Sequence, residues 1–246
     1  MINVLRRLFR AWIFVMGITI SCSCFANEYE NGVAASNRGD FGTALQLWRK
    51  LAAEGHAPSQ FQVGAMYFLG RVSLAGPFAG QLIPKDRKEA MKWWLLAAEQ
   101  GYPLAQYYLG AMYDEGEGVP RNIKEAAKWY VLAAKQGNSL AQFKVGLSLD
   151  RPGDYNEAVK WYLLSAKQGY QPAQQNLGVK YAKGQGVPPD YGKAYMWLSI
   201  AASNGDNDAK RNLASVSRNL SAEELHRAQE KATKCFSSNY KNCGPQ

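Results

Sequence analysis

The stretch YYLGAMYDEGEGVPRNIKEAAKWYVLAAKQG, which runs from Tyr107 to Gly137, decides the fold of this chain. It contains two segments with small and aromatic residues at helical spacing, a glycine-rich joint between them, and a closing glycine. In the second segment the apolar residues recur at intervals of three and four, which places them on one face of a helix. These residues are Ala126, Trp129, Tyr130, Ala133 and Ala134. The stretch therefore predicts two short helices joined by a tight turn.

The same arrangement recurs along the chain. The closing glycines are Gly55, Gly101, Gly137, Gly169 and Gly205, at intervals of 46, 36, 32 and 36 residues. Tryptophans follow nearly the same intervals, 45, 36, 32 and 36 residues, at Trp48, Trp93, Trp129, Trp161 and Trp197. A period in this range indicates stacked repeats, because one helix pair cannot bury its apolar face alone.

Two local signals recur within the units. The first helix of a unit contains an internal glycine, although glycine costs about 1 kcal/mol relative to alanine in a helix. We therefore expect a neighbouring helix to approach closely at Gly64, Gly110, Gly146 and Gly178. The second helix begins with a capping pair, in which an N-cap residue precedes a glutamate by three positions. Such pairs are Asp86–Glu89, Asn122–Glu125 and Asp154–Glu157, with Asp190 as a further cap and Ser221–Glu224 near the C-terminus.

The repeated pattern A-x-x-x-L-G-x-x-Y-x-x-G-x-G-V…A-x-x-W-Y-x-x-A-A-x-x-G resembles the Sel1-like repeat, a relative of the tetratricopeptide repeat. The resemblance covers Asp40 to Gly205 and extends to Cys235. It implies an all-α fold, a right-handed superhelical solenoid of antiparallel helix pairs with a concave groove. The expected organisation is a signal peptide (1–26), an N-terminal half-repeat or cap (27–56), four repeats (57–101, 102–137, 138–169 and 170–205), and a C-terminal capping helix pair with a disulfide-pinned tail (206–246).

The first 26 residues have the pattern of a secretory signal peptide. Arg6, Arg7 and Arg10 precede an apolar run, and small residues lead to a cleavage site after Ala26. The run is short for a transmembrane helix, so we expect a periplasmic or secreted mature chain without such a segment. Acylation of Cys22 is the alternative. Loss of three arginines lowers the formal charge from +9 to +6, which favours an acidic partner or reflects solubility alone.

Two cysteines remain after removal of the signal peptide, Cys235 and Cys243. Two cysteines in an exported protein most often pair. A disulfide closing so small a loop contributes about 2–3 kcal/mol in the chain-entropy model. We therefore expect it to pin the C-terminal tail.

The sequence contains no motif for catalysis, and we predict neither an enzyme nor a cofactor or metal site. His56 and His226 lie in different units, away from cysteines and carboxylate clusters. The Gly-x-Gly joints lack the preceding strand and third glycine of a dinucleotide loop. Ser238 and Lys241 formally match S-x-x-K, but they lie inside the cysteine loop and no K-T-G accompanies them. No basic stripe favours nucleic acid binding.

The resemblance implies that the first helix of each unit lines a partner-binding groove. Residues spaced by four and three then share the exposed face, although the aromatic ones are equally compatible with the core. The predicted groove residues are Phe61, Ala65 and Phe68; Tyr107, Ala111 and Asp114; Phe143, Leu147 and Asp150; and Gln175, Val179 and Ala182.

One insertion distinguishes the first full unit. It is longer than the others, and the surplus falls in RVSLAGPFAGQLI, residues 71–83. Leu74, Phe78, Leu82 and Ile83 lie there, in what should be an exposed joint. Either this loop is a partner contact, or it folds back over the neighbouring helices.

The most direct functional prediction is a non-catalytic periplasmic scaffold for protein–protein interaction, which presents a rigid groove to a protein partner. Relatives of this architecture include immunity proteins against phospholipase effectors of type VI secretion, which makes immunity one specific prediction. The alternatives are an envelope signalling or motility regulator, a secreted factor that binds a host protein, and, less favoured, an enzyme acting on the cell wall or β-lactams. The partner would be an effector, a sensor or an envelope protein.

Overall fold

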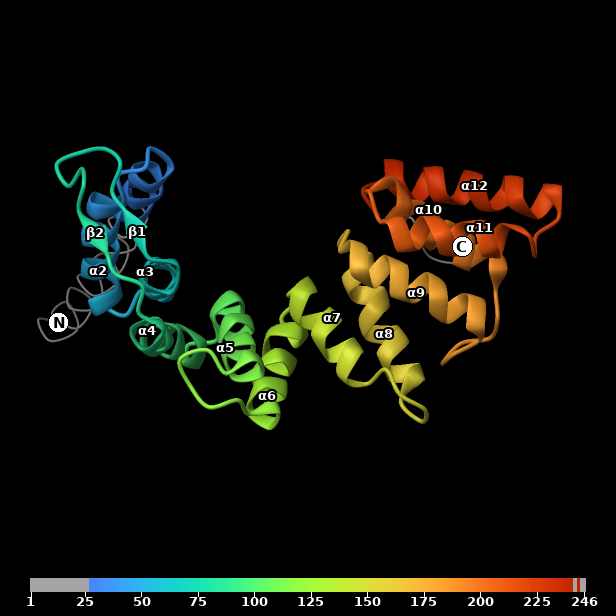
Figure 1. Cartoon of the computed structure of the whole chain (residues 1–246), viewed down its shortest axis with the longest axis horizontal. Coiled ribbons are helices and arrows are strands. Elements are labelled where there is room, and N and C mark those ends of the chain that lie inside the picture. The colour runs from blue at the N-terminus through green and yellow to red at the C-terminus, as the bar shows by residue number, and fades with distance from the viewer. Residues whose placement is uncertain (1–26, 241–242, 244–246) are drawn as a thin grey trace, which may run out of the picture. The chain divides into compact units, whose positions relative to one another are not determined.

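The computed structural model describes residues 27–240 and Cys243. The predicted signal peptide therefore lies outside the described residues. The described part is almost entirely helical, with one two-stranded hairpin, so the predicted all-α class of helix pairs is confirmed. The chain divides into two compact units at Arg121 and Asn122, and each unit is described separately (Figure 1).

The first unit begins with a helical segment, residues 27–37, followed by four labelled helices and a hairpin. They are α2 (Phe41–Ala53), α3 (Ala57–Leu69), β1 (Arg71–Val72), β2 (Leu82–Ile83), α4 (Arg87–Glu99) and α5 (Pro103–Glu115). The second unit consists of α6 (Ile123–Lys135), α7 (Ser139–Ser148), α8 (Tyr155–Ala166), α9 (Gln171–Lys183), α10 (Tyr191–Ser203), α11 (Asn207–Ser217) and α12 (Ala222–Ser237).

Three of the four glycines predicted to allow close helix packing, Gly64, Gly146 and Gly178, are confirmed as such sites, and Gly110 stays a prediction. A methyl group added at Gly64 would lie 2.4 Å from the indole of Trp94 and 3.1 Å from a backbone oxygen of α4. Any side chain there would force the two helices apart, because interiors are close-packed. The same contact recurs between Gly32 and Trp48, Gly146 and Tyr162, and Gly178 and Leu198.

Trp48 is one residue out of register with Trp93, Trp129, Trp161 and Trp197, although the intervals between these tryptophans are nearly those of the closing glycines. Trp48 is 2% exposed and lies seven residues before its closing glycine. The residue at that position in the next repeat is Trp94, which is 1% exposed, and not Trp93. Trp93 is only half-buried, and its indole donates to Glu89 Oε1 at 3.0 Å. The equivalent buried positions in later repeats are Tyr130, Tyr162 and Leu198.

The helix caps follow the sequence with one exception. Asp86 and Asn122 accept hydrogen bonds from the backbone N–H groups of the first turn, as does Asp190. Asp154 makes no such bond, and its carboxylate instead pairs with Arg151 at 2.6 Å. The short connection before α8 contains that arginine, which explains the difference. At Ser221 both halves of the predicted capping box are present.

The glycine-rich joints are compact because they lie against the preceding repeat. Gly186 has a φ of +77°, a region that favours glycine. A methyl group there would lie 2.4 Å from the backbone oxygen of Tyr155, at the start of α8. Gly118, with the same φ of +77°, approaches Arg87 at the start of α4 in the same way. The second glycine of each joint therefore serves both turn geometry and close packing.

A buried glutamine links each repeat to the one before it. Gln60 donates from Nε2 to the carbonyl oxygen of Ala52 at 3.1 Å and accepts at Oε1 from Gln100 Nε2 at 2.7 Å. The bond to Ala52 adds a side-chain donor to a last-turn carbonyl group that also accepts from the backbone N–H of Gly55 at 3.1 Å. Gln106, Gln142 and Gln174 make the same bond to Ala98, Ala134 and Ala166, and Gln168 donates to Gln142 at 2.8 Å.

The last repeat departs from this arrangement. Asn204 stands where the glutamines Gln100 and Gln168 stand in other repeats, one residue before the closing glycine. Its shorter amide donates instead to the hydroxyl of Tyr240 at 3.4 Å. Within the described residues, the buried Oε1 of Gln174 consequently has no hydrogen-bond partner.

The N-terminal segment is more than the predicted half-repeat. Residues 27–37 form a helix, Ala35 within it is 1% exposed, and the indole of Trp48 donates to the carbonyl oxygen of Tyr29 at 3.3 Å. Residues 27–56 therefore form a complete helix pair. The sequence prediction missed the first helix because it lacks the aromatic pattern of the later units.

The C-terminal end combines α11, α12 and the tail. Along α12, Ala232 and Cys235 pack into one core cluster with Trp197 and Ile200 of α10. Cys235 and Cys243 are joined by a disulfide with their Cα atoms 4.7 Å apart, and both are buried. α12 therefore covers the last repeat through its contact with α10.

Candidate functional site

The aromatic groove residues of the first unit pack between repeats. The ring of Phe61 lies 6.1 Å from Trp94, 5.5 Å from Tyr102 and 5.6 Å from Tyr108, measured between ring centroids. Such pairs contribute to stability beyond their buried area. Phe61 therefore contributes mainly to the packing of one repeat on the next.

Phe68 has a similar role. Its ring lies 4.9 Å from Trp94, and the guanidinium of Arg87 lies 3.5 Å from its centroid. Arg87 also donates to the carbonyl oxygen of Phe68 and pairs with Glu117 at 3.2 Å. The contacts hold the α3–α4 connection. The other predicted groove residues of this unit, Ala65, Tyr107, Ala111 and Asp114, are half-buried.

In the second unit, one groove residue remains substantially exposed. Phe143 lies 5.8 Å from Tyr162 and 5.1 Å from Tyr170, in the same kind of inter-repeat cluster. Leu147 is 44% exposed. Gln175 is half-buried, and Val179 and Ala182 pack against the cluster around α10 and α11. The structure thus places most of the predicted groove set within packing contacts.

Asp150 belongs to a polar contact between repeats. Its carboxylate accepts from the hydroxyl of Tyr162 at 3.0 Å and forms an ion pair with Lys180. The Lys180 side chain is only 7% exposed, and its ammonium lies 4.1 Å from the centroid of Tyr155. Burial, and secondarily the Asp150 charge, raise the pKa of Tyr162 well above its usual value. The tyrosine therefore stays a neutral donor.

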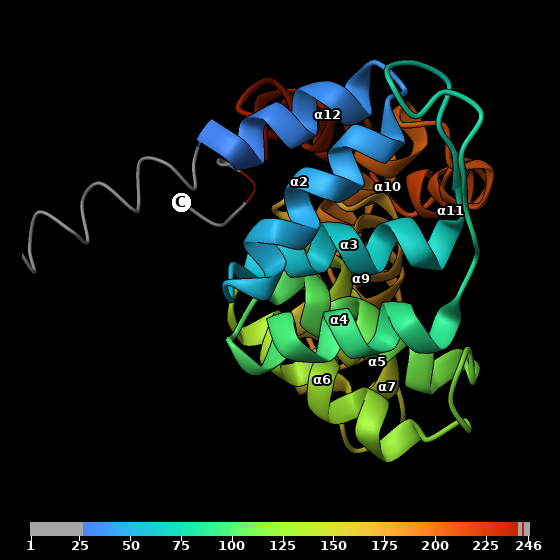
Figure 2. The same cartoon turned by 90° about the vertical axis from the view of Figure 1, so that its left-hand side faces the viewer.

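The insertion between α3 and α4 forms a hairpin on the first unit, in which Arg71 pairs with Ile83 and Val72 with Leu82. Figure 2 shows this connection, drawn in teal, passing the ends of α2 and α3. Ile83 is 3% exposed. Phe78 lies so close to Gly42 that a methyl group on that glycine would be 2.2 Å from the Phe78 Cβ. One side of the insertion therefore does fold back over the helices.

The opposite side of the same hairpin is apolar as well. Val72 is 47% exposed, Leu74 is 75% exposed and Leu82 is 65% exposed. Val72 and Leu82 are cross-strand partners, so their side chains share a face. A strand with one solvated face normally alternates apolar and polar residues. Leu74 follows β1, and its side chain lies beside Gly39 while staying largely exposed. We call these three exposed apolar residues of the insertion, Val72, Leu74 and Leu82, the hairpin face.

One basic residue, Lys85, borders the hairpin face. Lys85 is exposed, and residues 70–85 contain no aspartate or glutamate, although Asp86 follows directly. Arg71 is exposed too, but it pairs with the buried Ile83, and its guanidinium lies 5.3 Å from the centroid of Phe41 on the helix side. Asp40, which lies beneath the loop, is buried and accepts from the backbone N–H of Thr43. The face can therefore offer apolar contacts with positive charge at its margin.

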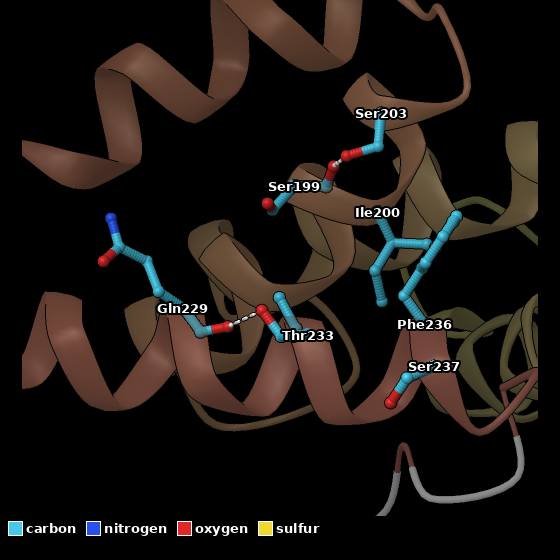
Figure 3. A pocket seen from close by; sticks show the side chains of 8 residues that line it. Ser199, Ile200, Ser203, Gln229, Thr233, Phe236 and Ser237 are labelled. Carbon is cyan, nitrogen blue, oxygen red and sulfur yellow. Dashed lines mark hydrogen bonds between the residues drawn. The ribbon is translucent and has the colours of Figure 1, made fainter.

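A small pocket in the second unit lies between α10 and α12, with a volume of about 280 Å³ (Figure 3). Ile200 and Phe236 form its apolar part. The hydroxyls of Ser203 and Thr233 donate to carbonyl oxygens of their own helices, those of Ser199 and Gln229, at 2.9 and 3.0 Å. No titratable group lies among its lining residues, so neither hydroxyl is activated as a nucleophile.

The two histidines lie in different units, His56 in the first and His226 in the second. His56 Nδ1 is 2.8 Å from the hydroxyl of Ser59, and burial lowers the pKa of its imidazole. His226 is exposed and lies 3.4 Å from a carboxylate oxygen of Glu230. Among the residues that the structure describes, no group of histidines, cysteines and carboxylates could hold a metal ion. Lys241 of the S-x-x-K match lies outside the described residues.

No helix within the described ranges is both long enough and apolar enough to cross a bilayer.

The family profile of the Sel1 repeat matches five consecutive segments, residues 26–56, 57–102, 103–138, 139–170 and 171–206. The chain belongs to the Sel1 repeat family. Sel1 repeat proteins serve as scaffolds for protein–protein interaction. The first Sel1 repeat includes helix 27–37, in agreement with the complete helix pair found there.

Solved structures support this assignment. A Sel1 repeat protein from Oxalobacter formigenes is 35% identical, with a TM-score of 0.63, over 71% of this chain and 49% of that chain. A protective antigen of uropathogenic Escherichia coli with the same fold is 26% identical, with a TM-score of 0.53, over 83% and 50%. The chitin synthase regulator SKT5 of Saccharomyces cerevisiae is 30% identical over 42% of this chain and 14% of that protein. This chain thus spans about half the length of the two solved chains and a small part of the length of the yeast relative.

The sequence predicts the hairpin of this Sel1 repeat protein less completely than it predicts the helices. Leu74 and Leu82 were predicted as contacts, whereas Val72 was not. The signal was present as a two-residue alternation between Val72 and Leu74, which is typical of a strand. The loop's length and its glycines obscured it.

Proposed function

We propose that this Sel1 repeat protein is an exported, non-catalytic scaffold that binds a protein partner through the hairpin face. The observation that supports this most is a hairpin with apolar residues on both sides, one against the helices and the other exposed. Exposed apolar clusters of this kind commonly mark interaction surfaces. The helices beneath the hairpin are well packed, so they hold the hairpin in one conformation.

The chemistry of the hairpin face suggests the chemistry of the partner. Burying a leucine side chain contributes about 1.5–3 kcal/mol, so two leucines can supply much of a micromolar affinity. Lys85 at the margin would favour a partner with an acidic residue beside an apolar patch. Leu147 in the second unit offers a further apolar contact from the predicted groove.

The compartment is part of the proposal. The N-terminal pattern of basic, apolar and small residues supports export to the periplasm, where an oxidised Cys235–Cys243 bond would persist. An effector, a sensor or an envelope protein would meet the scaffold there. The most specific form of the proposal is immunity, in which the partner is a phospholipase effector of type VI secretion.

The decisive experiment compares partner capture by matched variants. The native protein, Leu74→Ser/Leu82→Ser and the control Leu104→Ser are each exported, purified and incubated with envelope extracts at equal concentration. Leu104 is exposed on α5, outside the hairpin, so the control has the same chemistry at another site.

We expect one dominant protein to be retained by the native and Leu104→Ser forms and lost from the hairpin variant. Identification of a phospholipase, followed by protection of cells that produce both proteins, would establish the immunity form. Equal retention by all three proteins would remove the hairpin from the binding surface. Enrichment of no protein by the native form would refute an envelope scaffold.

A further inference from the structure

Beyond the hairpin, one apolar position recurs in the second helix of the last four repeats, whereas the first repeat has Lys50 there. It lies five residues before the closing glycine. Leu132 on α6 is 45% exposed and Leu164 on α8 is 48% exposed. Single exposed leucines are ordinary, but recurrence at one repeat position places both on equivalent faces of consecutive repeats in the second unit.

The last repeat shows what covers this position. The equivalent residue on α10 is Ile200, which is 1% exposed because it packs with Ala232 and Cys235 of α12. Figure 3 shows Ile200 facing Phe236 of that helix. The chain therefore contains its own example of a helix docked over the position that Leu132 and Leu164 leave open.

The charges around the position change with its coverage. Lys128 and Lys135 precede and follow Leu132 by four and three residues, and both are exposed. Around Ile200 the corresponding residues are Met196 and Ser203, which are neutral. The α12 residues that line this contact, Gln229, Thr233 and Ser237, are neutral too.

The repeat centred on Leu164 has the same basic pattern, with Lys160 and Lys167 at the same offsets. Lys128 and Lys160 each form an ion pair at 2.5 Å with the glutamate three residues earlier. Lys135 and Lys167 lie at the C-terminal ends of α6 and α8. The two uncovered positions on α6 and α8 are thus apolar with a basic margin, and the covered one on α10 is apolar with a neutral margin.

We propose that α6 and α8 form a docking surface for an amphipathic helix of another protein, with acidic residues beside its apolar stripe. Leu132 and Leu164 would contact the stripe, as Ile200 contacts α12, and Lys135 and Lys167 would face the acidic flank. Helix-in-groove recognition of this kind uses anchors spaced by three and four residues. A second copy of this basic surface is a poor occupant, since like charges would meet.

A pair of designed peptides tests this surface. Both are fluorescent helices of about 20 residues with the same leucine stripe, long enough for measurable helicity. One has glutamate beside the stripe and the other has lysine. The full chain is produced by export, and binding is followed by fluorescence anisotropy at low and high salt.

Three variants locate the contact. Leu132→Ser/Leu164→Ser removes the anchors, Lys135→Glu/Lys167→Glu reverses the margin, and Leu96→Ser is the matched control. Leu96 is 45% exposed at the same repeat position, but Glu99 replaces the following lysine there. All five substituted side chains are exposed, so thermal melting should stay close to that of the native protein.

We expect the acidic peptide to bind the native protein, more weakly at high salt, and to lose about tenfold or more in affinity with the double leucine variant. Leu96→Ser should bind as the native protein does, and the charge reversal should transfer preference to the basic peptide. Equal binding of both peptides, unchanged binding by the leucine variant, or no binding at about 1 mM peptide would each overturn the proposal. The hairpin variant Leu74→Ser/Leu82→Ser should bind the acidic peptide normally, which separates this test from the scaffold proposal.

Discussion

The missing hydrogen bond in the last repeat allows a mutation that should stabilise the protein. Asn204→Gln lengthens the side chain that fails to reach Gln174 Oε1, an acceptor without a partner among the described residues. The geometry is already present one repeat earlier, where Gln168 Nε2 donates to Gln142 Oε1 at 2.8 Å. The substitution should therefore complete the same contact.

The magnitude follows from the groups involved. A net intramolecular hydrogen bond contributes about 0.5–1.5 kcal/mol, and an unsatisfied buried acceptor costs about 1–3 kcal/mol. The bond given up, from Asn204 to Tyr240, spans 3.4 Å at an exposed position and offsets little. The longer side chain loses more rotamer freedom. We expect a net gain of about 1 kcal/mol in the free energy of unfolding, which corresponds to about 2–4 °C in Tm for a chain of this size.

Urea denaturation and thermal melting measure the effect, with two comparisons. Gln168→Asn should lose a similar amount, because it removes the equivalent bond in the preceding repeat. Asn204→Gln should gain nothing when Gln174 is replaced by Ala, since the acceptor is then absent. The reasoning fails if Asn204→Gln leaves stability unchanged while Gln168→Asn lowers it, or if the gain persists without Gln174.

Three further outcomes are expected. Gly64→Ala should lower the free energy of unfolding by about 1–3 kcal/mol despite alanine's higher helix propensity, because the added methyl would lie 2.4 Å from Trp94; a gain in urea stability would contradict the close contact. Cys235→Ser/Cys243→Ser should lower stability by about 2–3 kcal/mol, and a reducing agent should have that effect on the native protein and none on the variant. Burial lowers the pKa of His56 below its usual 6.5, so the unfolded state binds the proton more readily. The contribution of His56 to stability should therefore be present above about pH 6.5 and fall as the pH drops through the depressed folded pKa, and His56→Gln should flatten that slope in melts across this range; an unchanged slope would assign it to other groups.

Local signals in the sequence predicted much of the fold correctly. Closing glycines, internal glycines and most N-caps act within one helix or between adjacent helices, so a recurring motif reports them directly. The first helix, 27–37, was missed because its pattern is weaker. The groove residues were less predictable, because the position of Phe61 shows only that it lies on an apolar side. It cannot show that Trp94, Tyr102 and Tyr108 surround it.

The sequence by itself determined that helix pairs repeat along the chain and that glycine is needed where two helices meet. Helical periodicity is a property of neighbouring residues, and five repetitions make it unmistakable. Only the tertiary structure decided between adjacent candidates, such as Trp93 and Trp94, which differ by one step around the helix. It also decided which side of the hairpin is buried and that α12 covers Ile200 while Leu132 stays exposed. These outcomes depend on contacts between segments far apart in the chain, which local periodicity does not encode.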